Sequence, residues 1–367
     1  MKHIIDGVDF HELEAQKYWV HPSSYSADRK KTETQQMIFS GDYIGARKMD
    51  GAFYKFVKDE DGGMELIGRS KGVGGDYLDK IDWVPQLHDF FSALPNGTCL
   101  LGEIYFPDNE GSKNTTTIMG CGVEKARDRQ EKGPKLYYYV FDVLAYGGCS
   151  LYKEPIEVRV NYIENLKTFM DEKSFVKLAD YREGADLWNH LQTILGSGGE
   201  GIVITKKGTC YQPGKRPARQ TLKVKKELRV DIDAFIIGAN PPTRLYSGKE
   251  VETWQYYVDD LTNERLPVSA HYKEFNEGKS IVPVTKNYYY GWAGSLKLGL
   301  YDERGEVYYL GDVSGLTEEV KENWKNYLGK VCVITGMEIW EGHIRHPKFV
   351  EWRSDKKPEE CLKSQVF

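Results

Sequence analysis

The sequence predicts an α+β protein that is dominated by strands and built of two domains. The chain has 367 residues, more than the roughly 100 to 200 residues of one typical domain. Runs of alternating or β-branched residues recur through its first two-thirds, with helical spacing in two stretches between them. The character of the sequence changes near residue 229, so we place the domains at 1–229 and 230–367.

The first domain carries most of the predicted strands. They lie at 53–58, 64–68, 98–106, 136–144, 201–205 and 221–225. Asp61-Gly62 between the first two indicates a hairpin turn, because glycine supplies the positive φ of a tight turn. Apolar residues recur with helical spacing over 158–170 and 185–195, which predicts two helices.

The second domain is predicted to consist of short strands interrupted by one helix. The strands are expected at 231–238, 295–301, 307–310 and 331–340, and the helix at 316–328. This order fits a small Greek-key barrel such as an OB-fold. The stretch 240–292 is rich in Gly, Pro and Tyr, and we interpret it as an insertion between two barrel strands.

Composition excludes several classes of protein. Hydrophobic residues make up 40% of the chain and charged residues 29%, which is incompatible with a disordered protein. The charge-free stretches fall short of the ~18 apolar residues that cross a bilayer, and the first residues lack the apolar core of a secretory signal. We therefore expect a cytoplasmic protein that does not enter the membrane.

Cysteine and histidine spacing predicts neither disulfides nor a zinc site. The six cysteines include no CxxC pair, so we interpret them as reduced thiols. His343 and His346 are the one close histidine pair, and no carboxylate spacing around them resembles a metal motif.

The charge of the chain is unevenly distributed. A net charge of −5 by itself argues against a nucleic-acid-binding protein. Between residues 206 and 229, however, nine lysines and arginines accompany the single acid Glu227. The sequence therefore predicts a local basic face.

Five short motifs follow one another in a fixed order. They are Lys48-Met-Asp-Gly51, Leu101-Gly-Glu103-Ile, Phe141-Asp-Val-Leu144, Glu200-Gly-Ile-Val203 and Lys223-Val-Lys225. A KxDG match alone arises often by chance, and Asp50-Gly51 would also suit an ordinary hairpin turn. The five motifs in this order are a much stronger signal than any one of them.

The ordered motifs resemble those of the covalent nucleotidyltransferase superfamily, specifically the short, phage-like ATP-dependent DNA ligases. Further stretches extend the resemblance over about residues 46–359: 211–216, 222–226, 294–302, 311–315, 345–349 and the RxDK motif at 353–356. The resemblance implies an ATP-grasp-like nucleotidyltransferase domain with antiparallel sheets, followed by an OB-fold domain that carries RxDK. It also implies that the OB domain closes over the nucleotide in the first step and later swings away.

The resemblance assigns a role to each motif. Lys48 would attack the α-phosphate of ATP, and it must be neutral to do so, although the ordinary pKa of lysine is ~10.4. We expect burial and the cations Lys223 and Lys225 to depress its pKa. Glu200 would hold Mg²⁺ or Mn²⁺, and Glu103 would bind ribose or a second metal ion.

The remaining assigned residues would contact ATP or DNA. Phe141 would stack on adenine, and Arg69 would touch the nucleotide and later the 5′-phosphate of the nick. The other predicted ATP contacts are Arg216, Lys223, Lys225, Arg353 and Lys356. The other predicted DNA contacts are Lys206, Lys207, Arg219 and Lys226. Taken singly, these residues would also suit a solvated basic strand, a core aromatic or surface acids.

The sequence departs from the family pattern at Phe53, where KxDGxR has arginine. Lys55, two residues on and on the same strand face, is our candidate substitute. RNA ligases often lack this arginine, which keeps that alternative open.

The second departure is the predicted insertion at 240–292. Its aromatic residues include Trp254, Tyr256, Tyr257, Tyr272, Phe275, Tyr288, Tyr289, Tyr290 and Trp292. They would either embrace the DNA duplex or pack into a small core of their own.

The sequence thus predicts an ATP-dependent DNA ligase that seals 5′-phosphate/3′-hydroxyl nicks in duplex DNA through enzyme-adenylate and DNA-adenylate intermediates. We expect a monomer that binds DNA with its two domains, because the first 45 residues leave no room for a separate DNA-binding domain. The alternatives are an RNA ligase or mRNA-capping guanylyltransferase, and a catalytically silent OB-type nucleic-acid binder.

Overall fold

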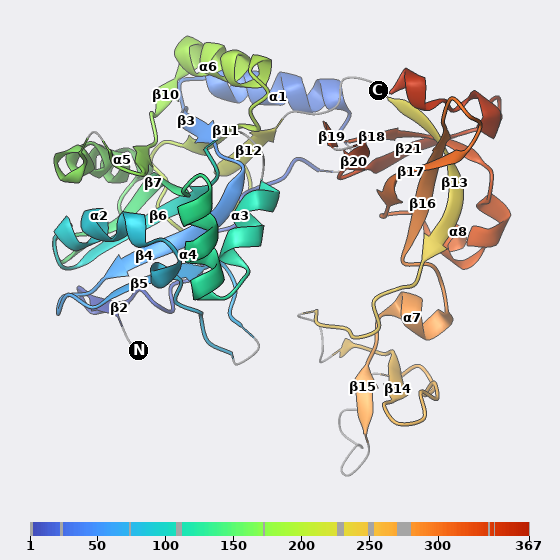
Figure 1. Cartoon of the computed structure of the whole chain (residues 1–367), viewed down its shortest axis with the longest axis horizontal. Coiled ribbons are helices and arrows are strands. Elements are labelled where there is room, and N and C mark those ends of the chain that lie inside the picture. The colour runs from blue at the N-terminus through green and yellow to red at the C-terminus, as the bar shows by residue number, and fades with distance from the viewer. Residues whose placement is uncertain are drawn as a thin grey trace. The chain divides into compact units, whose positions relative to one another are not determined.

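The computed structural model divides the chain into two compact units, Met1–Lys226 and Glu227–Phe367 (Figure 1). It describes residues 3–22, 25–72, 75–107, 112–171, 173–225, 231–248, 253–269, 280–336, 338–340 and 342–366. No helix among these residues is both long and apolar enough to cross a membrane.

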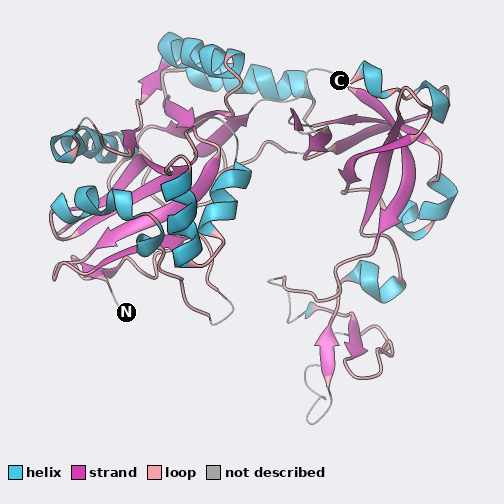
Figure 2. Cartoon of the chain, in the orientation of Figure 1, coloured by secondary structure: helices cyan, strands magenta, loops and turns pink. Residues whose placement is uncertain are grey.

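The first unit is built on two antiparallel sheets (Figure 2). The larger has the order β5-β4-β6-β7-β8, with the short β9 parallel to β7. Its strands are β4 (Gly51–Lys58), β5 (Met64–Gly68), β6 (Thr98–Tyr105), β7 (Tyr137–Tyr146), β8 (Cys149–Ser150) and β9 (Val176–Leu178).

The smaller sheet has the order β10-β3-β11-β12. Its strands are β3 (Tyr43–Lys48), β10 (Arg182–Glu183), β11 (Gly201–Lys206) and β12 (Thr221–Lys225). The six strands predicted for this domain are confirmed within a few residues, whereas β3 was not predicted.

Helices cover one face of each sheet. The helices of this unit are α1 (Ala27–Phe39), α2 (His88–Ala93), α3 (Ser112–Met119), α4 (Val123–Lys132), α5 (Ile156–Asn165) and α6 (Gly184–Gly196). Figure 1 shows α1 and α6 side by side, and their apolar residues share a core with β3, β11 and β12. Helices α2 to α5 share a core with residues of the larger sheet such as Phe56 and Leu100. The predicted helix at 185–195 is confirmed as α6, and the one at 158–170 is α5 followed by a 3₁₀ turn at Leu166–Phe169.

The segment 3–22 packs on the other face of the larger sheet. It includes the short strands β1 (Ile4–Ile5) and β2 (Val8–Asp9). Ile5 and Phe10 are fully buried against Val57 and Leu101, which alternate in the sheet with residues of the helical core. The larger sheet is therefore covered on both faces, which explains why its strands are apolar over long runs.

The second unit centres on a five-stranded antiparallel sheet. Its strand order is β17-β16-β13-β18-β21. These strands are β13 (Ile232–Asn240), β16 (Ser295–Tyr301), β17 (Val307–Val313), β18 (Val331–Thr335) and β21 (Lys348–Arg353). One parallel bridge joins Ser314, after β17, to Lys348 in β21. The pairings of the described residues do not otherwise link β17 to β21, so they do not show a closed barrel.

Two predicted elements of this unit need correction. The helix expected at 316–328 is the single turn α8 (Glu318–Glu322) followed by a 3₁₀ turn at Trp324–Tyr327. The strand expected at 331–340 is divided into β18 and β19 (Glu338–Trp340), and β19 pairs with β20 (His343–Arg345) instead.

The segment 240–292 has a small core of its own. It contains β14 (Tyr257–Asp259), β15 (Ile281–Pro283) and α7 (Lys286–Tyr290), and its core is formed by the buried residues Val258, Val284 and Tyr289. Its aromatic rings pack on one another: Trp254 contacts Tyr256, which in turn contacts Tyr289 and Tyr290. These contacts agree with the interpretation of an embellishment with its own core. Tyr272 and Phe275 lie outside the described residues.

Candidate active site

Three of the five motifs meet across the smaller sheet of the first unit. Lys48 is the last residue of β3 and pairs with Gly201 at the start of β11, which pairs with Lys225 at the end of β12. Residues directly opposite in an antiparallel sheet point to the same face. Lys223 pairs with Val203 two positions along, so it faces the same way as Lys225. The register of the sheet therefore brings the three lysines to one face.

Glu200, which precedes β11, joins two of these lysines. Its Oε2 accepts a hydrogen bond of 2.7 Å from Lys48 Nζ, and its Oε1 lies 2.5 Å from Lys225 Nζ. The Glu200 side chain is only 5% exposed. One buried carboxylate thus compensates the charge of two lysines that are neighbours across Gly201.

Gly201 is required by the close approach of β12. Its φ is +137°, and a Cβ there would lie 1.9 Å from the carbonyl oxygen of Val224. Any other residue would push β12 and Lys225 away from Glu200. The glycine of the EGIV motif therefore sets the distance between the two sides of the site.

The pKa of Lys48 differs from the sequence-based expectation. Burial lowers the pKa of Lys48, but the charges of Glu103 and Glu200 raise it by more than burial lowers it. The pKa of Lys48 therefore lies above its ordinary value. The expectation of a depressed pKa is wrong for this structure, because an acid rather than a cation is the nearest partner of Lys48. The lowered pKa belongs to Lys223 instead, through burial and the charges of Lys225 and Lys48.

Glu103 is the second acid of the site, beside Glu200. Its Oε1 accepts a hydrogen bond of 3.2 Å from the backbone N–H of Gly51, and burial raises the pKa of its carboxyl group. Gly51 has no room for a side chain, since a Cβ would lie 2.2 Å from the carbonyl oxygen of Ile104. The charges of Glu103 and Glu200 both act on Lys48. Two carboxylates beside Lys48 offer the hard oxygen ligands that suit Mg²⁺ or Mn²⁺.

Phe53 and Arg69 lie together next to these acids. Phe53 pairs with Glu103 across β4 and β6, and the guanidinium of Arg69 lies 4.8 Å from the centroid of its ring. The rings of Phe53 and Phe141 are 6.3 Å apart. The residue that departs from KxDGxR therefore supports an arginine that directly follows β5 rather than one that belongs to β4.

Lys55 does not replace the missing arginine. It is only 4% exposed, and its Nζ donates hydrogen bonds to the carbonyl oxygens of Phe10, His11 and Leu13. Its role is to hold the segment 3–22 against β4. The sequence placed Lys55 on the correct strand, but it did not predict that the segment 3–22 packs on this strand and binds the Lys55 amine.

The predicted basic face is partly neutralised. Lys207 pairs with Glu183, and Arg219 pairs with Glu33. Lys206, at the end of β11, and Arg216, in the loop before β12, are exposed. Lys226 lies outside the described residues. The free positive charge of this face is therefore smaller than the sequence count suggests.

Arg353 and Lys356 belong to the second unit, where they share one acid. Asp233 of β13 lies 3.3 Å from Arg353 Nη1 and pairs with Lys356, while Asp355 contacts Arg353 Nη2 at 2.8 Å. The RxDK motif is thus a compact cluster at the end of β21, separate in the chain from the residues around Lys48.

Tyr18 is a site residue that sequence reasoning missed. The segment that contains Tyr18 runs alongside β12. The N–H of Trp19 donates a hydrogen bond of 2.6 Å to the carbonyl oxygen of Thr221, and Trp19 forms a parallel bridge with Leu222. Burial and the charge of Glu103 raise the pKa of Tyr18 to about 12, against the opposing charges of Lys48 and Arg69. Tyr18 is therefore near enough to Glu103, Lys48 and Arg69 for their charges to act on its hydroxyl group. No motif marks it, and the one signal in the sequence is the aromatic pair Tyr18-Trp19.

Comparison with known proteins agrees with this geometry. A family model described as the ATP-dependent DNA ligase domain matches residues 27–225, more than half of the chain. DNA ligase C1 of Mycolicibacterium smegmatis is 24% identical over 267 residues, and this chain spans 62% of the length of that relative.

Two solved structures share the fold. A Lig E DNA ligase, described as binding DNA with a minimal scaffold, has a TM-score of 0.56 and 16% identity, covering 93% of this chain and 98% of that one. The protein Pmar-Lig_Pre has a TM-score of 0.58 and 13% identity, with 89% of this chain and 66% of that one covered.

Proposed function

Because the chain belongs to the ATP-dependent DNA ligase family, we propose that it seals 5′-phosphate/3′-hydroxyl nicks in duplex DNA at the expense of ATP. The observation that carries the proposal is the register Lys48–Gly201–Lys225 with Glu200 between the two lysines. This arrangement places one nucleophilic amine, one further cation and a carboxylate within a single, partly buried cluster. A basic surface strand would need no such shared acid.

The proposed reaction begins at Lys48. Its Nζ, once it has given up the proton that it donates to Glu200, attacks the α-phosphorus of ATP. The N–P bond forms while the bond to pyrophosphate breaks with pyrophosphate as the leaving group, and a second proton passes from the nitrogen to solvent. The AMP is then passed to the 5′-phosphate of the nick, and attack by the 3′-hydroxyl releases it. Glu103 and Glu200 would hold Mg²⁺ or Mn²⁺, which stabilises negative charge on the phosphate when bound.

The residues around this centre have distinct proposed roles. Lys223 and Lys225 neutralise charge that develops on the α-phosphate. Phe141 stacks on the adenine, and Arg69 binds a phosphate from its position over Phe53. Tyr18 lies at the edge of the site, in the segment that runs alongside β12. We also propose that the second unit is an OB barrel closed beside the Ser314–Lys348 bridge, and that the protein acts on nicked DNA as a cytoplasmic monomer.

Phe53 favours one second candidate, an RNA ligase, because that class often lacks the arginine of KxDGxR. Intact mass after incubation with ATP or GTP and Mg²⁺ tests the nucleotide chemistry, and sealing of nicked DNA against nicked RNA tests the substrate. We expect one adenylyl group per chain from ATP, none from GTP, and faster sealing of the DNA nick. Covalent GMP, or no covalent nucleotide at all, would contradict the proposal.

Removal of Arg353 or Lys356 should impair one step selectively. We propose that these cations orient the departing pyrophosphate, and they have no such task once pyrophosphate has left. Arg353→Ala and Lys356→Ala should therefore lose self-adenylation by roughly 10²-fold but still seal a nick supplied already adenylated at its 5′ end. The measurement compares the rates of the two reactions for each variant.

The control for this experiment is Lys357→Ala, which removes a neighbouring lysine outside the cluster around Asp233. It should change neither rate. If the Arg353 and Lys356 variants remain folded and fail equally on the pre-adenylated nick, RxDK belongs to the surface that seals DNA.

Binding of a nicked duplex should depend strongly on salt despite the net charge of −5. Each lysine that contacts a phosphate releases counterions from the DNA. Because Lys206 is exposed, Lys206→Ala should reduce the slope of log K against log salt by about 1. Titration of a labelled duplex at several salt concentrations measures this slope.

Lys207→Ala serves as the comparison, because Lys207 is already paired with Glu183. It should alter the slope less than Lys206→Ala does. Equal slopes for Lys206→Ala and the unchanged protein would place the DNA elsewhere.

A further inference from the structure

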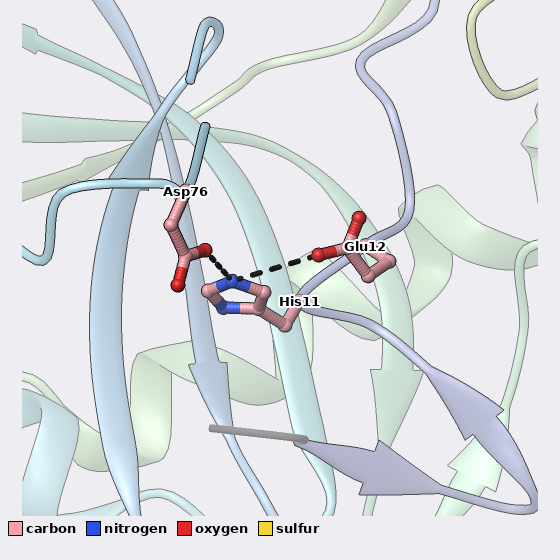
Figure 3. Close-up of side chains that lie close together, drawn as sticks. All are labelled: His11, Glu12 and Asp76. Carbon is pink, nitrogen blue, oxygen red and sulfur yellow. Dashed lines mark hydrogen bonds and ion pairs between the residues drawn. The ribbon is translucent and has the colours of Figure 1, made fainter. Parts of the chain in front are cut away.

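His11 is a buried histidine surrounded by carboxylates, outside the site described above (Figure 3). Its Nδ1 lies 2.8 Å from Glu65 Oε2 in β5. Its Nε2 lies 2.9 Å from Asp76 Oδ1 and 3.9 Å from Glu12 Oε1. Figure 3 shows Asp76 and Glu12 on either side of this second nitrogen. The imidazole therefore has its Nδ1 fixed by Glu65, while its Nε2 is directed between Asp76 and Glu12.

The burial of Glu65 distinguishes the residues around His11 from a cluster of acids on the surface. Glu65 is only 4% exposed, and its Oε1 is buried without a hydrogen-bond partner among the described residues. A buried carboxylate that orients one nitrogen of a histidine commonly fixes the other nitrogen as a metal ligand, and it raises the basicity of that ligand. Lys55 anchors the backbone here by donating to the carbonyl oxygen of His11 at 3.1 Å. The histidine is thus held in place independently of Glu12 and Asp76.

The ligand atoms are close enough to share one ion. One atom each from His11, Glu12 and Asp76 lie within 4.8 Å of one another. We propose that these three residues bind a divalent transition-metal ion of the Zn²⁺ class, with Glu65 orienting His11. One imidazole and two carboxylates suit Zn²⁺, while the imidazole disfavours Mg²⁺, which prefers oxygen ligands alone.

The competing arrangement is an imidazolium ion held between Glu65 and Asp76. Burial lowers the pKa of His11, but hydrogen bonds to Asp76 and Glu65 raise it overall. Lys71 also pairs with Glu12 at 2.8 Å. A metal ion would take the place of the imidazole proton and of Lys71 as the partner of Glu12. The two arrangements therefore differ in whether Zn²⁺ binds at all.

Metal binding here would fasten the segment 3–22 to the loop after β5. His11 and Glu12 belong to that segment, and Asp76 to the loop. A ligand that binds only the folded state raises its thermal stability. The unfolding temperature of the unchanged protein should therefore rise on addition of ZnCl₂, and Asp76→Asn should reduce this rise, whereas any rise caused by MgCl₂ should be the same in both proteins.

The test uses exposed residues, so that folding is not at risk. The side chains of Asp76 and Glu12 are 67% and 52% exposed. Calorimetric titration of the full chain with ZnCl₂ should show one site that Asp76→Asn and Glu12→Gln each weaken at least tenfold. Asp61→Asn, an exposed acid in the β4–β5 turn, is the matched control and should leave the affinity unchanged.

Zn²⁺ can also bind thiols or the acids near Lys48, so only the difference between variants and control supports the site. If Asp76→Asn and Glu12→Gln bind Zn²⁺ as tightly as Asp61→Asn, the proposal is overturned. It is also overturned if the unchanged protein takes up no Zn²⁺, which would leave the imidazolium ion pair. Neither result depends on ligase activity.

Discussion

Lys48→Ala is expected to leave the protein without covalent AMP after incubation with ATP and Mg²⁺. The reason is chemical: alanine has no side-chain nitrogen with which to form the phosphoramidate, and neither of the two neighbouring lysines that the structure describes has the same position. Lys225 lies on the far side of Glu200, and Lys223 is two residues farther along β12. Intact mass spectrometry measures the loss of the adduct, and peptide mapping of the unchanged protein locates it.

Lys206→Ala is the matched control, because it removes a lysine from the same sheet without touching Glu200. It should retain the full adduct. An adduct of unchanged size in Lys48→Ala, or its location on another lysine, would show that the KxDG motif has been misassigned.

Glu200→Gln is expected to slow self-adenylation and sealing on the order of 10² to 10³-fold, because a metal ligand contributes several kcal/mol to stabilising transition-state charge. The amide has nearly the shape of the carboxylate but no charge to offer a metal ion or the two lysines. The affinity for nicked DNA should hardly change, since Glu200 is buried. Single-turnover adenylation rates and duplex titrations measure the two effects separately.

Glu183→Gln provides the comparison, because it breaks another Glu–Lys pair at the edge of the same sheet. Its exposed pair with Lys207 should matter little for either measurement. A loss of DNA affinity in Glu200→Gln as large as the loss of adenylation would make Glu200 a structural residue rather than a participant in the reaction.

The strands with the clearest alternation, and the helix α6, were predictable from the sequence, whereas β3 was not. Tyr43, Ile44, Gly45 and Ala46 of β3 are all buried, so the strand shows no period of two. Gly45 would also argue against a strand, although here it allows close packing, since a Cβ would lie 2.9 Å from the carbonyl oxygen of Val203. A strand buried on both faces is recognised only when its neighbours are known.

The candidate site shows the same limit. The ordered motifs predicted which residues belong together, because each motif requires particular residue types. They did not predict the direction of the pKa shift of Lys48, which depends on the distance between its Nζ and Glu200. They also missed Tyr18, because its place depends on a backbone path along β12 that no local pattern specifies.

The ion pair between Lys48 and Glu200 has a consequence for side reactions of the resting protein. An amine that is held as an ammonium ion has no lone pair to offer, so acyl phosphates, carbon dioxide and other electrophiles of the cell should modify Lys48 slowly. In the proposed reaction Glu200 must release Lys48, and between turnovers the same carboxylate preserves Lys48 as an unmodified amine.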